Sequence, residues 1–106
     1  MEKVFNKLVR DKIPDIIKSN NEKCDIRILN DNEFKKELYK KLLEEATEVI
    51  HAKDEEVKEE LADTLEIIIK IAEIYNSNLN EIIELRDKKR LKKGSFDKKI
   101  FLEKTY

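Results

Sequence analysis

Apolar side chains recur every three or four residues over three long stretches of the chain. This spacing is typical of an amphipathic α-helix, because it keeps one face of the helix apolar along its length. A shorter helix is expected after Pro14, since proline is tolerated in a first helical turn. The three longer stretches predict helices over about 32–51, 55–76 and 79–92.

Short polar connections separate these predicted helices. Asp54 ends the Ala-Lys-Asp break between the first two long helices and is expected to cap the second. Asn30 or Asp31 is expected to cap the first, and Gly94 to end the third. Helices joined by so short a break are antiparallel neighbours. The sequence therefore predicts an all-α antiparallel hairpin or bundle, in a single domain over residues 1–106.

Two segments outside the helices alternate apolar and polar residues, as strands do. In residues 24–29 the apolar positions are Ile26 and Ile28, and in the tail they are Ile100 and Leu102. We expect these two segments to be able to pair as a minor two-stranded β-ribbon beside the helices.

Composition agrees with long helices and sets limits on partners and location. Charged residues make up 44% of the 106-residue chain and hydrophobic residues 40%, while the net charge is only −1. A chain of this length buries only about two-thirds of its unfolded surface, so dimerisation would help to stabilise it. The near-zero net charge predicts no stable nucleic-acid partner. The lone Cys24 cannot form a disulfide within the chain, and no export signal or membrane-spanning stretch is evident, which predicts a cytoplasmic protein.

Acidic side chains interrupt the apolar faces of the first two helices near the predicted turn. Within each helix the acids are three residues apart, and the two pairs lie symmetrically about residue 54, so antiparallel helices place them opposite each other. Carboxylates this close cannot all stay ionised without a positive charge between them. Oxygen-only ligands favour a hard cation, so we expect Mg²⁺, or Mn²⁺, to be held there. The expected metal ligands are Glu45, Glu48, Glu60 and Asp63.

Further residues are candidates for the chemistry that such a cation supports. Glu44, beside the ligands, is the candidate for orienting an attacking water. The strongly basic run over residues 86–93 suits a phosphate-binding role, although it also suits a solvated helix end. The candidates for substrate binding are Arg10, Lys12, Lys41, Lys89 and Lys93.

Two interpretations from other classes compete with a magnesium site. Glu48 and His51 form a Glu-x-x-His pair, and two such pairs with two further glutamates make the di-iron site of ferritin-like bundles. A homodimer supplies both pairs, although His51 projects about 60° around the helix from Glu48. The other alternative is a non-enzymatic helical interaction module in which the acids are merely solvated.

The residues also carry a family resemblance. The segments EEATE (44–48) and EELAD (59–63) resemble the EExxE…ExxD pattern of the MazG-like all-α nucleoside triphosphate pyrophosphohydrolases. NKLVRDKIP (6–14) and KKGSF (92–96) are similar to flanking segments of small single-domain members. The likeness covers most of the chain. Where many relatives have Arg-Gly-Gly-Phe, this chain has Lys93 followed by Gly-Ser-Phe, which keeps the charge without a bidentate guanidinium.

The resemblance implies a Mg²⁺-dependent enzyme that cleaves a nucleoside triphosphate between its α- and β-phosphates, leaving a monophosphate and pyrophosphate. By motif position it gives the same four acids as metal ligands and Glu44 as the residue that orients water. It also implies dimers or larger oligomers with sites near the subunit interface. Phosphoribosyl-ATP, the substrate of one branch of the wider superfamily, is the alternative substrate.

Overall fold

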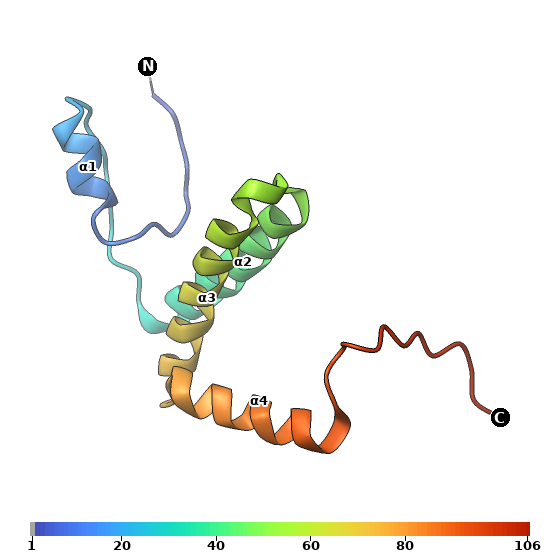
Figure 1. Cartoon of the computed structure of the whole chain (residues 1–106). Helices are drawn as coiled ribbons and strands as arrows, with labels where there is room; N and C mark the ends of the chain where they lie inside the picture. Colours follow the sequence, from blue (N-terminus) through green and yellow to red (C-terminus); the bar gives the residue numbers. More distant parts are fainter. Residues whose placement is uncertain (1) are drawn as a thin grey trace.

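Helices are the only regular elements in the computed structural model, which describes residues 2–106 (Figure 1). A short 3-10 helix, η1, precedes the third α-helix, and the segments between and beyond the helices are irregular. The all-α prediction is confirmed. The elements are α1 (Ile13–Ser19), α2 (Asp31–His51), η1 (Asp54–Glu56), α3 (Val57–Ile74) and α4 (Leu79–Lys93).

Asparagine side chains begin two of the long helices. The Oδ1 atom of Asn30 accepts a hydrogen bond of 2.9 Å from the backbone N–H of Glu33, so Asn30 caps α2. Asn78 caps α4 in the same way, by accepting from the backbone N–H of Glu81 at 2.9 Å. In both cases a donor left free by the first helical turn is satisfied locally.

The turn between α2 and α3 differs from its prediction. Asp54 does not cap α3; it begins η1, and no side chain caps either η1 or α3. The backbone N–H of Glu56 donates to the carbonyl oxygen of Lys53 at 2.8 Å instead. The tight 3-10 turn therefore supplies a backbone hydrogen bond in place of a side-chain cap, and α3 begins two residues later than predicted.

Residues with positive φ follow α3 and α4. Asn76 has φ 56°, its N–H donates to the carbonyl of Glu73, and the next N–H, of Ser77, donates to the carbonyl of Ala72 at 2.9 Å. This pair of bonds is the Schellman arrangement, which stops a helix and redirects the chain. Gly94, with φ 86°, follows α4 as the sequence predicts.

The α2–α3 hairpin is the centre of the molecule (Figure 1). Leu38 and Ala72, at 2% and 6% exposure, are its buried hydrophobic residues among those the structure describes. Of the elements in residues 2–106, α1 packs on no other helix, and α4 packs only on α3. The radius of gyration is 18.4 Å, against about 13 Å for a compact domain of this length. A single chain therefore buries little apolar surface.

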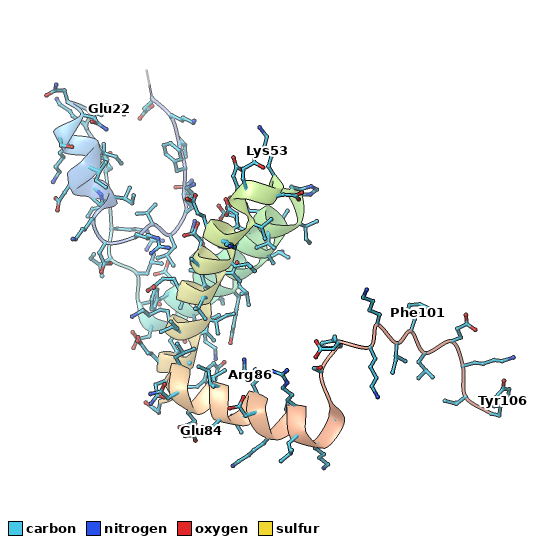
Figure 2. All side chains as sticks on the ribbon, in the orientation of Figure 1. Glu22, Lys53, Glu84, Arg86, Phe101 and Tyr106 are labelled. Carbon is cyan, nitrogen blue, oxygen red and sulfur yellow. The ribbon has the colours of Figure 1, made fainter. Side chains whose placement is uncertain are left out.

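The segments expected to form a ribbon lie apart. Residues 24–29 precede α2, whereas the tail runs away from the hairpin beyond α4, with Phe101 and Tyr106 in the open (Figure 2). Neither segment forms a strand in this single chain, so the ribbon stays a prediction. No helix in residues 2–106 has both the length and the apolarity to cross a bilayer.

Leu38→Ala is expected to lower the free energy of unfolding by about 2–5 kcal/mol, because it leaves a cavity in the only well-packed part of the hairpin. Urea unfolding at one fixed protein concentration measures this loss. Leu91→Ala is the matched control, because Leu91 is 91% exposed and should change stability by less than about 0.5 kcal/mol. Equal losses in the two variants would contradict this assignment of the core.

Candidate metal site

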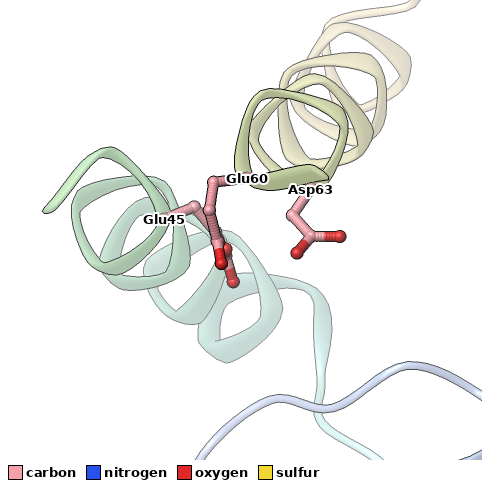
Figure 3. A group of neighbouring side chains, drawn as sticks. All are labelled: Glu45, Glu60 and Asp63. Carbon is pink, nitrogen blue, oxygen red and sulfur yellow. The ribbon is translucent and has the colours of Figure 1, made fainter. Parts of the chain in front are cut away.

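Three carboxylates from the two hairpin helices converge near the turn (Figure 3). Glu45 comes from α2, and Glu60 and Asp63 come from the first two turns of α3. Each side chain offers an oxygen atom, and these three oxygens lie within 4.8 Å of one another. The hairpin therefore brings together three of the four acids that the sequence predicts as ligands.

Burial sets two of these carboxylates apart from ordinary surface acids. Glu45 is only 9% exposed, and Glu60 is half-buried. One oxygen of each, Oε2, is buried without a hydrogen-bond partner. An unpartnered buried carboxylate oxygen is costly, so both atoms favour a proton or a bound cation as a partner.

The same crowding raises the pKa values of both glutamates. Burial is the largest cause that raises the pKa of Glu45, and the charges of Glu48 and Asp63 raise it further, against a lowering effect of Lys41. Burial also leads the causes that raise the pKa of Glu60, followed by its contact with Glu48. Protons or a cation thus compete for the same oxygens.

Glu48, the fourth predicted ligand, stands beside this group and is not part of it. Its side chain is exposed, and its oxygens do not join the three that converge. It nevertheless raises the pKa of both Glu45 and Glu60, so it is close to the centre of the cluster.

Two cations contact the edge of the cluster. Nη2 of Arg10 lies 2.8 Å from Oδ1 of Asp63, which ties the N-terminal segment to α3. Nζ of Lys41 lies 3.4 Å from Oε2 of Glu44 and 4.0 Å from Oε1 of Glu45. Both cations are predicted substrate-binding residues, and both lie at the edge of the cluster. The ion pair of Arg10 with Asp63 spans 53 positions of sequence, so no local signal predicts it.

The other predicted residues lie further out. Lys12 is exposed at the N-terminus of α1, two residues after Arg10. Lys89 and Lys93 are exposed on α4, which begins at the end of the hairpin opposite the turn (Figure 1). About 20 Å of helix separates Glu60 from that end, so one chain does not bring these two lysines to its own carboxylates.

The predicted water-orienting residue and the lone histidine are both outside the converging group. Glu44 is adjacent to Glu45 in sequence, but its side chain is paired with Lys41. His51 is exposed at the last position of α2 and is not among the residues that converge. The cluster within residues 2–106 is therefore made of oxygen ligands alone.

The converging oxygens fit a small hard cation. Mg²⁺ holds oxygen ligands at about 2.1 Å, so two oxygens on one ion lie at most about 4.2 Å apart. The three oxygens lie within 4.8 Å of one another, which is close to that spacing. The all-carboxylate donor set excludes soft ligation and suits a hard divalent cation such as Mg²⁺, Mn²⁺ or Ca²⁺.

Without metal, Glu45→Gln is expected to stabilise the protein at pH 7 and to flatten its dependence on pH. Between the ordinary glutamate pKa of about 4.3 and the raised pKa, the folded chain binds more protons than the unfolded chain. The extra proton on Glu45 therefore stabilises the folded chain fully below this pH window, and the stabilisation is lost as the pH rises through the window. Urea unfolding in EDTA from about pH 4 to pH 8 measures how the free energy of unfolding changes with pH, and this change should be smaller in Glu45→Gln.

Glu59→Gln is the matched control, because Glu59 is exposed one residue from Glu60 and outside the cluster. With a divalent cation at about 100 times its dissociation constant, the free energy of unfolding of the unchanged chain and of Glu59→Gln should rise by about 2.7 kcal/mol. The rise should be much smaller in Glu45→Gln. An equal response in all three proteins would place the cation elsewhere.

The cluster can thus hold a cation between two helices, with a guanidinium and an ammonium group at its rim. Such an arrangement suits an anionic ligand that bridges the cation and the rim. Comparisons of the chain with models of protein families, with curated proteins and with solved structures find no match.

Proposed function

We propose that this chain is a Mg²⁺-dependent nucleoside triphosphate pyrophosphohydrolase that releases a nucleoside monophosphate and pyrophosphate. The observation that carries the proposal is the convergence of Glu45, Glu60 and Asp63, with two buried carboxylate oxygens that have no partner. Carboxylates in structural ion pairs have their partners within the protein, whereas these two oxygens lack one and can bind a cation. Arg10 and Lys41 at the rim favour an anionic ligand on that cation.

Each group in the cluster has a role in this proposal. Glu45, Glu60 and Asp63 would hold the cation, and Glu48, which stands beside them, would be the fourth ligand. Bound there, Mg²⁺ would supply positive charge that offsets the charge of the leaving pyrophosphate. Arg10, a planar bidentate donor, turns from Asp63 to the phosphate oxygens when the substrate arrives.

The remaining chemistry falls to the side chains of α2. Glu44 orients a water molecule and accepts its proton as the water oxygen attacks phosphorus and the bond to the bridging oxygen breaks. Lys41 Nζ, 3.4 Å from Oε2 of Glu44 and 4.0 Å from Oε1 of Glu45, holds the Glu44 carboxylate at the edge of the cluster. The products are the monophosphate and pyrophosphate, and the proton from water passes to Glu44.

The resemblance to MazG-like enzymes supports the same conclusion. Three of the positions that match EExxE…ExxD, those of Glu45, Glu60 and Asp63, are the positions whose carboxylates converge in the hairpin. The proposal includes a homo-oligomer in the cytoplasm, and phosphoribosyl-ATP as the second candidate substrate. The buried oxygens without a partner argue against a non-enzymatic module with merely solvated acids, because a solvated carboxylate has water as its partner.

A nucleotide panel tests the activity directly. With Mg²⁺, the unchanged chain should release pyrophosphate, and not single phosphate, from at least one canonical or damaged nucleotide or from phosphoribosyl-ATP. Glu60→Gln should lower kcat/KM by at least about 100-fold, since removal of a group that stabilises developing charge costs about 2.7–4 kcal/mol. The release is measured by separate assays of pyrophosphate and phosphate.

Glu59→Gln is again the control and should retain activity, because Glu59 lies outside the cluster. Absence of pyrophosphate release from the whole panel by the folded chain, with Mg²⁺ and with Mn²⁺, would refute the proposal. Loss of activity in both variants would show only that α3 tolerates no change.

Arg10→Ala is expected to raise KM by about 10- to 100-fold, because a charge-assisted hydrogen bond to phosphate contributes about 1.5–3 kcal/mol. Steady-state kinetics on the best substrate of the panel measure it. Lys18→Ala, at the exposed end of α1, is the matched control and should leave KM unchanged. An unchanged KM in Arg10→Ala would restrict Arg10 to its ion pair with Asp63.

A further inference from the structure

A pocket lies at the end of the hairpin opposite the turn, where α2 begins and α3 ends. Its volume is about 430 Å³, within the range of about 300–1,000 Å³ that is usual for small-molecule sites. We call it the end pocket, and its lining residues are Asp31 and Phe34 of α2 and Lys70, Glu73 and Ile74 of α3. None of these residues has a role in the proposed chemistry.

The end pocket and the carboxylate cluster lie on the same side of the hairpin. Lys70 follows Asp63 by seven residues, so the two side chains project within about 20° of each other around α3. On α2, Phe34 precedes Lys41 by seven residues, and Lys41 contacts Glu45 of the cluster. Seven residues span about 10 Å of helix. The end pocket is therefore about the length of a nucleoside away from the cluster.

The N-terminal segment passes close to both places. Nη2 of Arg10 lies 2.8 Å from Oδ1 of Asp63 in the cluster. The hydrogen bond with Glu73 is the largest cause that raises the pKa of Lys70, and the charge of Asp11 raises it further. Since consecutive residues of one segment act on the cluster and on the end pocket, the two are neighbouring parts of one surface.

The side chains of the end pocket define the shape and polarity of a ligand. Phe34 and Ile74 are half-buried and offer apolar surface to a flat ring. Nζ of Lys70 donates to Oε2 of Glu73 at 2.6 Å, and an ammonium group has two further donors. The carboxylate of Asp31 only accepts hydrogen bonds. A matching ligand is thus flat, with donors toward Asp31 and an acceptor toward Lys70.

Guanine is the nucleobase with this arrangement of polar groups. Its N1–H and N2–H₂ groups are adjacent donors, which a carboxylate accepts together, and its O6 and N7 atoms are acceptors that lysine recognises. Adenine and cytosine each place an acceptor nitrogen beside the amino group, and the single ring N–H of uracil or thymine lies between two carbonyl oxygens. Those acceptors would face the carboxylate of Asp31 and be repelled by it.

We propose that the end pocket binds the guanine base of a nucleotide whose phosphates lie at the carboxylate cluster. Asp31 accepts from N1–H and N2–H₂, Lys70 donates to O6, and Phe34 stacks on the ring. The place of the phosphates rests on the proposed function, whereas the preference for the base rests on the lining of the pocket alone. The chain is therefore selective for guanine nucleotides.

The ratio of kcat/KM for GTP to kcat/KM for ATP tests this selectivity. In the unchanged chain, pyrophosphate release should favour GTP by at least about tenfold, as one bidentate contact to a base allows. Asp31→Asn turns an amide N–H₂ toward the donors of guanine, so the ratio should fall by at least about tenfold while kcat with saturating ATP stays the same. Asp15→Asn, the same change at an exposed position in the first turn of α1, should keep the ratio.

Binding of the four ribonucleoside monophosphates, which contain no bond for the enzyme to cleave, tests the pocket without catalysis. Titration calorimetry with Mg²⁺ should show GMP bound at least about tenfold more tightly than AMP, CMP or UMP. Lys70→Met should weaken GMP binding by at least about tenfold. Lys58→Met, at an exposed position of α3 far from the end pocket, should leave it unchanged.

The two measurements separate this inference from the proposed function. Pyrophosphate release without preference for GTP, or with a ratio unchanged in Asp31→Asn, would overturn the inference and leave the proposed function standing. Equal binding of the four monophosphates, or binding of none, would overturn it as well. Preferential binding of GMP by a chain that hydrolyses no nucleotide would refute the proposed function and support the end pocket as a guanine site.

Discussion

Negative charge held between two helices is the constraint on which this structure depends. Glu45 and Glu60 lie where a hairpin of this size would otherwise place apolar side chains, and each keeps a buried oxygen without a partner. Their raised pKa values express the same conflict, since burial and neighbouring acids both oppose ionisation. A cation relieves the conflict at once, because it replaces the lost hydration and the missing hydrogen bonds together. The hairpin thus leaves these two buried oxygens to a proton or a cation.

This constraint also explains why the single chain has so small a core. The contact between α2 and α3 is shared between a few apolar side chains, such as Leu38, and the carboxylates near the turn. Other apolar residues, such as Leu43 and Leu65, point away from that contact and remain exposed. The buried carboxylates and the exposed apolar side chains are therefore two consequences of one distribution of residues. In our proposed function a cation with its phosphates completes the carboxylate cluster.

Local signals predicted the helices well, and the cluster followed from them. The cap at Asn30, the stop at Gly94 and the helical spacing of apolar residues all depend on neighbours within a few positions. The group of Glu45, Glu60 and Asp63 required only the additional assumption of an antiparallel hairpin.

Features set by distant contacts or by competing backbone geometries were not predicted. Asp54 was expected to be a cap, but a 3-10 turn satisfies the backbone there. The ion pair of Arg10 with Asp63 depends on how the N-terminal segment returns to α3. The positions of Lys89 and Lys93 depend on the direction in which α4 leaves the hairpin.

The turn between α2 and α3 sets the geometry of the cluster more directly than any ligand does. The spacing of Glu60 and Asp63 is fixed within α3, but their register against Glu45 is fixed only by the turn. One residue more or less in that turn would move the residues of α3 relative to α2 by about 1.5 Å along the helix and about 100° around it. Because ligand oxygens tolerate errors of only tenths of an ångström, such a change would disperse the carboxylates while it left both helices intact. The backbone hydrogen bond from Glu56 to Lys53, which holds the 3-10 turn, is thus part of the support of the candidate metal site.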